Sequence, residues 1–147
     1  MRRTSIRDDG GSALAEFAVI APLVLVLLIG SIEVGRFAQY SILVAGSARA
    51  GVQYGSQNLV TALDLTGMQN SALADGQNVA GLTATATQYC QCADGTTSSC
   101  LPTDCAASHR LVYVRVDTAG VIPSLLHMPG LPATYSVGGH AVMRVRQ

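Results

Sequence analysis

Residues 12–32 of this chain read S-A-L-A-E-F-A-V-I-A-P-L-V-L-V-L-L-I-G-S-I, and Glu16 is the only charged residue among them. A bilayer core about 30 Å thick needs about 20 helical residues at about 1.5 Å per residue. The segment has that length, and its V-L-V-L-L-I centre offers no polar face to water. We therefore predict a membrane-spanning helix. The alternative is a helix buried in the core of a soluble protein.

Arginine residues around this segment predict its orientation. Arg2, Arg3 and Arg7 precede it, and only Arg36 follows closely. The positive-inside rule then keeps the N-terminus in the cytoplasm and sends the rest of the chain outside. An ordinary secretory signal is disfavoured, because the nearest A-x-A cleavage site lies at residues 48–50, well beyond the apolar run.

The composition excludes several classes of protein. Only 12% of the 147 residues are charged, against about 25% in typical soluble domains. Hydrophobic residues make up 49%, so the chain is not expected to be disordered. The net charge is zero, which disfavours nucleic-acid binding. The sequence contains no Lys, and this excludes Schiff-base and P-loop chemistry.

No pattern of catalytic residues is present in the sequence. G-x-S-x-G, H-E-x-x-H and G-x-G-x-x-G do not occur. The three histidines, His109, His127 and His140, lie on different predicted segments without a spaced acidic partner. We therefore expect no enzymatic activity, no cofactor and no small-molecule substrate.

The start of the apolar run resembles a class III prepilin signal, because Gly11 is followed by Ser12 and then by Glu16 at position plus five. The wider run G-S-A-L-A-E-F-A-V-I-A-P is similar to the TadE-like family of minor pseudopilins, from the tight-adherence (Tad/Flp) pilus system. The resemblance continues through E-V-G-R-F-A-Q-Y to A-R-A-G-V-Q-Y-G, about 45 residues in all. The C-terminal half resembles the family only in its general arrangement, which includes the closing A-V-M-R-V-R strand.

The resemblance implies a non-enzymatic pilus assembly component in a bacterial inner membrane, with its C-terminal domain in the periplasm or at the cell surface. Residues 1–11 would be a cytoplasmic leader that a prepilin peptidase removes after Gly11. The partners implied are other TadE/TadF-like pseudopilins, the Tad inner-membrane platform, the prepilin peptidase and membrane lipid. Adhesion and biofilm formation are the implied roles in the cell.

The carboxylate of Glu16 is costly within an apolar helix, and pairing with a cation lowers that cost. A carboxylate at mid-membrane costs about 2.5–3.5 kcal/mol on insertion scales. The resemblance implies an intersubunit charge pair between Glu16 and the new amine of Ser12 on a neighbouring subunit. The alternative is an unpaired Glu16 that reaches toward the membrane surface.

The sequence predicts an α+β, pilin-like fold, in which a long transmembrane and amphipathic helix packs on a small antiparallel sheet of three or four strands. The helix would run from about residue 12 to 56, with 12–32 in the membrane, 33–56 as its extracytoplasmic continuation, and a kink at Pro22. A small disulfide-stapled α+β domain would occupy 57–147. It would hold a short helix within 58–78 and strands at 82–89, 110–117 and 134–146. Gly138-Gly139 is a candidate break in the last strand.

Four cysteines, Cys90, Cys92, Cys100 and Cys105, lie within 16 residues between two predicted strands. Outside the cytoplasm disulfides persist, and two bridges would staple this loop. Cys90 and Cys92 are one residue apart and are not expected to pair. Two pairings remain open: Cys90–Cys105 with Cys92–Cys100, or Cys90–Cys100 with Cys92–Cys105.

Two other functions are open from the sequence. One is an uncleaved single-pass membrane protein with an extracytoplasmic binding domain. The other is a small metal-binding protein, in which the cysteine cluster and His109 would hold Zn. The C-x-C and C-x4-C spacings are not the usual pair of C-x2-C knuckles. Free or redox-active thiols are the remaining possibility for the cysteines.

Overall fold

The computed structural model describes residues 10–101, 103–106, 108–125 and 132–146. Most of the predicted leader, His127 and Pro129 therefore lie outside the described residues. The chain divides into two compact units, Met1–Arg36 and Phe37–Gln147. The first helix, α1 (Gly10–Gly55), begins in the first unit and ends in the second.

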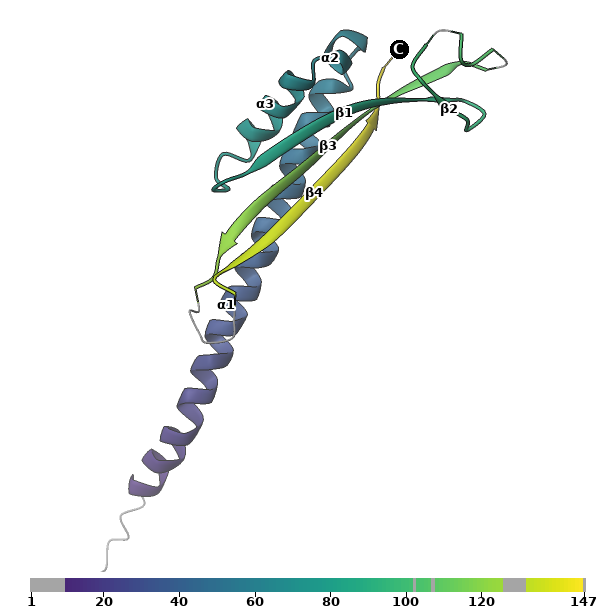
Figure 1. The fold of residues 1–147 in the computed structure, drawn as a ribbon. Helices are drawn as coiled ribbons and strands as arrows, with labels where there is room; N and C mark the ends of the chain where they lie inside the picture. The colour runs from purple at the N-terminus through teal and green to yellow at the C-terminus, as the bar shows by residue number, and fades with distance from the viewer. Residues whose placement is uncertain (1–9, 102, 107, 126–131, 147) are drawn as a thin grey trace, which may run out of the picture. The chain divides into compact units, whose positions relative to one another are not determined.

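The first unit consists of the N-terminal part of α1 among the described residues (Figure 1). The apolar stretch lies in the one helix of the described chain that is long and apolar enough to cross a membrane, Ala13–Gly55. Its most apolar 18-residue window has a mean hydropathy of 2.5, and none of that window is buried. The long N-terminal apolar helix expected from the sequence is confirmed.

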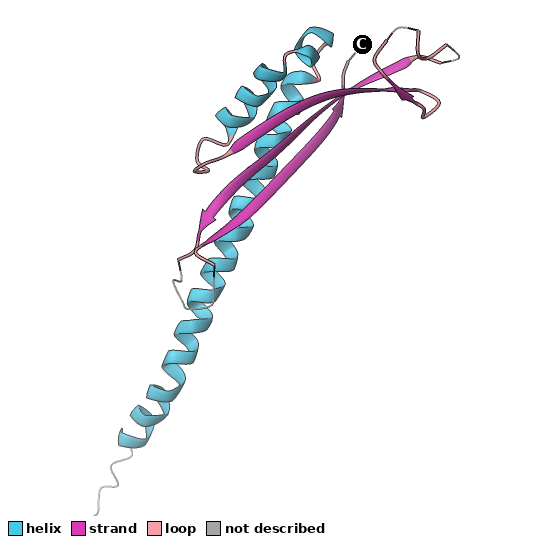
Figure 2. Cartoon of the chain, viewed as in Figure 1, coloured by secondary structure: helices cyan, strands magenta, loops and turns pink. Residues whose placement is uncertain are grey.

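The second unit is a sheet with helices on one face (Figure 2). After α1 come α2 (Leu59–Leu63) and α3 (Leu65–Asp75), followed by the strands β1 (Thr83–Cys92), β2 (Thr97–Ser98), β3 (Arg110–Pro123) and β4 (Thr134–Arg144). The strand order is β2-β1-β3-β4, and every neighbouring pair is antiparallel. The α+β fold with a four-stranded antiparallel sheet is thus confirmed.

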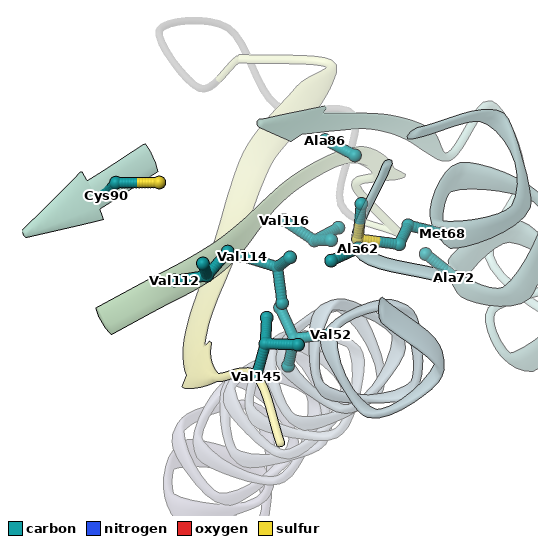
Figure 3. Packing of buried hydrophobic residues seen from close by; sticks show 10 residues of the cluster. All are labelled: Val52, Ala62, Met68, Ala72, Ala86, Cys90, Val112, Val114, Val116 and Val145. Atoms are coloured by element: carbon teal, nitrogen blue, oxygen red, sulfur yellow. The ribbon is translucent and has the colours of Figure 1, made fainter. Parts of the chain in front are cut away.

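The core of this unit lies between the sheet and the helices (Figure 3). Alternate residues of β3 point inward, and Val112, Val114 and Val116 are all buried. They pack with Val52 of α1 and Met68 of α3. The alternation of residues predicted for this strand therefore directs one set of apolar side chains toward the helices.

The elements differ from the predicted ones in several places, and β3 is longer than the strand predicted at 110–117. The helix expected within 58–78 is two helices, because Asn58 caps α2 in a capping box with Thr61 and Asp64 starts α3 by accepting from the N–H of Gly67. β4 runs unbroken through Gly138 and Gly139. The predicted cysteine loop also contains the two-residue strand β2, which pairs with the end of β1.

Candidate functional site

The N-terminal part of α1 exposes its apolar side chains all around the helix. Phe17, Leu23, Val26 and Leu27 are each more than three-fifths exposed. Such a surface is unfavourable in water, because exposed apolar area costs roughly 25 cal/mol per Å². Something other than the described part of this unit must therefore cover the helix, and lipid or the helices of other subunits have the matching chemistry.

Glu16 lies one turn into this apolar segment. It lines a shallow, mostly apolar concavity together with Ala15, Val19 and Ile20. Gly11, before the predicted cleavage point, lies in the first turn of α1, and a Cβ added there would meet no atom of the described residues within 4 Å.

Polar groups near the C-terminal end of the apolar segment are neutralised within the helix. Ser31 donates its hydroxyl proton to the carbonyl of Leu28 at 2.8 Å. Arg36 donates to a Glu33 carboxylate oxygen at 3.3 Å, one turn earlier. Such pairing lowers the cost of placing these groups near lipid. α1 continues through Pro22 without ending, and a bend at that residue stays a prediction.

Glycines in the second unit let α1 approach its neighbours closely. A Cβ on Gly51 would lie 2.9 Å from the carbonyl oxygen of Met68, and a Cβ on Gly55 would overlap the Met68 thioether. The G-x-x-x-G pair at these positions therefore serves packing of α1 on α3 within this chain. On β4, Gly139 makes a similar approach to α1 at Ala45.

The two disulfides of the structure join Cys90 to Cys100 and Cys92 to Cys105. This is one of the two pairings that the sequence left open. Cys90 and Cys92 lie two apart on β1 and are both buried, so their side chains leave the same side of the strand. Both bridges therefore draw the following loop toward the same face of the sheet.

Hydrogen bonds to Asp104 organise the loop between these bridges. One carboxylate oxygen accepts from the hydroxyls of Ser98 and Ser99 and from the backbone N–H of Ser99. These donors, with the Ser99 hydroxyl first, lower the pKa of Asp104. Arg110 of β3 donates from Nη1 to the carbonyl of Cys100 and thereby ties the loop to the sheet.

The sheet face opposite the helices carries an aromatic pair and an ion pair. The rings of Tyr89 and Tyr113 stack across β1 and β3 with centroids 5.3 Å apart. Arg115 donates to both oxygens of Asp117 at 2.8 and 2.6 Å, and this lowers the pKa of Asp117. The tyrosine pair follows from the register of β1 and β3, and the ion pair follows from the alternation of side chains along β3.

The candidate metal ligands named from the sequence were the four cysteines and His109. Among the residues that the structure describes, no group of three or more His, Cys, Asp or Glu side chains could hold a metal ion. The four cysteines, which were the candidate ligands, are all in disulfides. His109 lies just before β3, whereas His140 lies on β4 opposite Asp117 of β3, an acidic neighbour that the sequence did not indicate.

Sequence reasoning missed several residues that connect distant parts of the second unit. Asp104 was not singled out from the sequence, and the serine pair at 98–99 was the available signal for its role in the loop. Thr118 donates its hydroxyl to the carbonyl of Val44 at 2.7 Å, and Phe37 contacts the ring of Tyr135 edge-on at 6.4 Å. Neither of these contacts has a local sequence signal, because the partners are far apart in the chain.

Residues 11–53 match the family described as TadE-like protein. The resemblance to this family, stated above from the residues after Gly11, is thereby confirmed over that segment. No curated protein and no solved structure matches the chain. The matched segment contains the apolar half of α1, Glu16, and the part of α1 that packs on the sheet. The match indicates a Tad pilus-associated protein.

Proposed function

We propose that this protein is a non-enzymatic minor pseudopilin, or pilus assembly component, of a Tad (Flp) pilus system. It is anchored in the bacterial inner membrane by the N-terminal half of α1, with its N-terminus in the cytoplasm and its domain outside. The observation that carries the proposal is the TadE-like match over residues 11–53, because it covers the helix whose apolar surface is left open.

Three features support an assembly role for this helix. Its apolar side chains are exposed on every side, which suits packing first in lipid and then among other helices. Glu16 places one carboxylate within this apolar segment, where a charge is costly. Ser12, as the new N-terminus after cleavage, would supply a cation to Glu16 of a neighbouring subunit.

The domain outside the membrane would contact partner pilus proteins. The two disulfides suit an oxidising compartment, which agrees with the orientation predicted from Arg2, Arg3 and Arg7. The partners proposed are other TadE/TadF-like pseudopilins, the Tad inner-membrane platform and a prepilin peptidase. An uncleaved membrane protein with a binding domain is the second candidate, favoured by the continuous helix across Gly11 and Ser12.

The intact mass of the protein extracted from its native membrane tests the proposal. A mature chain beginning at Ser12 is expected. Gly11→Ala should block this processing and leave the chain full length, because the peptidase must reach the peptide bond after a residue without a side chain. Gly35→Ala is the matched control, since its added Cβ also meets no atom within 4 Å. A wild-type chain beginning at Met1 would overturn the cleavage and favour the second candidate.

A further inference from the structure

The end of the second unit where β3 passes into β4 is apolar and aromatic. The ring of Phe37, at the start of this unit, lies edge-on to that of Tyr135 at 6.4 Å and 81°. Ile122 and Val137 of the same two strands are buried in a hydrophobic cluster, and Tyr40 packs against this cluster. The surface is nevertheless open, since Phe37 is 45% exposed and Leu125 is 53% exposed.

This end of the unit carries no formal charge along its strands or its helix. Between Asp117 and Arg144 the sequence has no Asp, Glu, Lys or Arg, and the same holds between Arg36 and Arg49. Its backbone is also paired where β3 ends, because Ser124 donates its N–H to the carbonyl of Ala133 at 2.9 Å. Uncharged side chains and paired backbone groups are what contact with lipid requires.

Phe37 is close along the chain to the predicted membrane span. Phe37 follows Ile32, the last residue of the predicted span, by five residues of the same helix. At about 1.5 Å per residue this is roughly 7.5 Å along α1. The headgroup region on one side of a bilayer is about 5–8 Å thick, from a total of about 40–45 Å and a core of about 30 Å.

We propose that the surface formed by Phe37, Tyr40, Leu125 and Tyr135 lies in the headgroup region of the bilayer that α1 spans. Phenolic and aromatic rings with one apolar and one polar end are enriched at this depth. The proposal rests on the membrane anchoring in the proposed function. It assigns to the domain a second, peripheral contact with phospholipid, which would restrict how the domain tilts on its helix.

Lipid is favoured over a protein partner because Phe37 follows the predicted membrane span by only five residues of the same helix. A protein partner that bound here would have to displace the lipid headgroups from the same side chains. The tyrosines could also serve a protein partner, and the experiment therefore distinguishes the two.

The chain has no Trp, so a single introduced Trp is the only indole emitter. Leu125→Trp probes the proposed contact. Leu101→Trp is the matched control, because Leu101 is 57% exposed and lies in the disulfide loop at the other end of the sheet. β3 is 14 residues long, and its ends are therefore about 43 Å apart at about 3.3 Å per step from residue to residue. Val26→Trp, in the middle of the apolar segment, reports on the anchor itself.

The three full-length variants are reconstituted in phosphatidylcholine–phosphatidylglycerol vesicles whose acyl chains are brominated either near the headgroup or near the chain end. Val26→Trp should lose emission to the deep bromines. Leu125→Trp should lose emission to the shallow bromines and shift to the blue, and Leu101→Trp should do neither.

Two results would overturn the inference, and they differ in what else they affect. If Val26→Trp is quenched while Leu125→Trp emits like Leu101→Trp, the anchor stands and the apolar end does not meet lipid. A protein partner would then be its occupant. If Val26→Trp is quenched by neither bromine position, the membrane anchor of the proposed function fails, and the lipid contact fails with it.

Discussion

Gly139 of β4 and Ala45 of α1 meet backbone to backbone. A Cβ added to Gly139 would lie 2.7 Å from the Cα of Ala45 and 2.8 Å from the carbonyl oxygen of Val44. Real Cβ atoms do not approach other atoms so closely, and neither neighbour is a flexible side chain that could turn away. The edge strand β4 can therefore lie against α1 only because residue 139 has no side chain.

Gly139→Ala should destabilise the second unit by about 1–3 kcal/mol, as overpacking of a close contact does. Gly138→Ala is the control, since its Cβ would meet nothing nearer than the carbonyl oxygen of Thr118 at 3.7 Å. Urea unfolding of the full-length protein in detergent measures both. Equal midpoints for the two variants would show that α1 and β4 do not touch at this position.

Thr118→Val should cost about 0.5–1.5 kcal/mol, the net value of a buried hydrogen bond. The hydroxyl of Thr118 donates to the carbonyl of Val44 at 2.7 Å and is buried, whereas Val has the same shape without the donor. Thr85→Val, on the exposed face of β1, should change stability little. A loss for Thr85→Val as large as that for Thr118→Val would contradict the assignment. Urea unfolding of the full-length protein in detergent measures both variants.

Removing either disulfide should lower stability by about 3 kcal/mol, since the bridges span sequence separations of 10 and 13 residues. The double variants Cys90→Ser/Cys100→Ser and Cys92→Ser/Cys105→Ser each remove one complete bridge. Peptide mapping of the unreduced protein should recover these two pairs. Recovery of Cys90 joined to Cys105 would replace the observed pairing with the other one.

Acid should weaken the contact between the helices through Asp64. The N–H of Gly67 and the hydroxyl of Tyr54 stabilise the ionised carboxylate, so the pKa of Asp64 is below its usual value of 3.8. Its contribution is therefore present above that value and is lost as the pH falls through the lowered pKa. The urea midpoint of the wild type should drop further than that of Asp64→Asn between about pH 5 and pH 3.

Tyr54→Phe separates the two donors to Asp64. This variant keeps the N–H of Gly67 and removes the hydroxyl, which donates at 2.8 Å. The pH dependence should then lie between those of the wild type and Asp64→Asn. Superimposable pH profiles for all three proteins would refute a role for this carboxylate in stability.

Glu16→Gln should leave processing after Gly11 intact and reduce the number of pili. The amide has nearly the same size as the carboxylate, so helix packing is kept while the proposed charge pair with Ser12 of a neighbour is lost. Glu33→Gln is a control for charge removal elsewhere on the helix, where the partner is Arg36 in the same chain. An unchanged pilus count for Glu16→Gln would remove the intersubunit pair from the proposal.

The strands and helices were predictable where their sequence is periodic. Leu111 to Asp117 alternates apolar and polar residues, and the central strand β3 contains it, although β3 continues to Pro123. The continuation was missed because T-A-G-V-I-P contains a glycine and a proline, which usually end a strand. The side chains of Val79 and Val44 pack where a Cβ of residue 120 would be. A glycine therefore fits at this position of the strand.

The candidate site was predictable only as far as its chemistry is local. Glu16 within an apolar run and Gly11 before it are readable from neighbouring residues, whereas their roles in processing and assembly stay predictions. The surface containing Phe37 and Tyr135 was not readable, because 98 positions of sequence separate two rings that lie 6.4 Å apart. Such a contact depends on the register of β3 and β4 and on where α1 meets them.

The sequence by itself determined that this chain has one long apolar helix, an α+β domain and a TadE-like N-terminal segment. Composition, length and short-range periodicity carry that information, since each depends on neighbouring residues alone. Only the tertiary structure decided that Cys90 pairs with Cys100 and that Gly139 admits the backbone of α1 at Ala45. Both depend on distances through space between segments, and the spacing of residues along the chain leaves more than one such arrangement open.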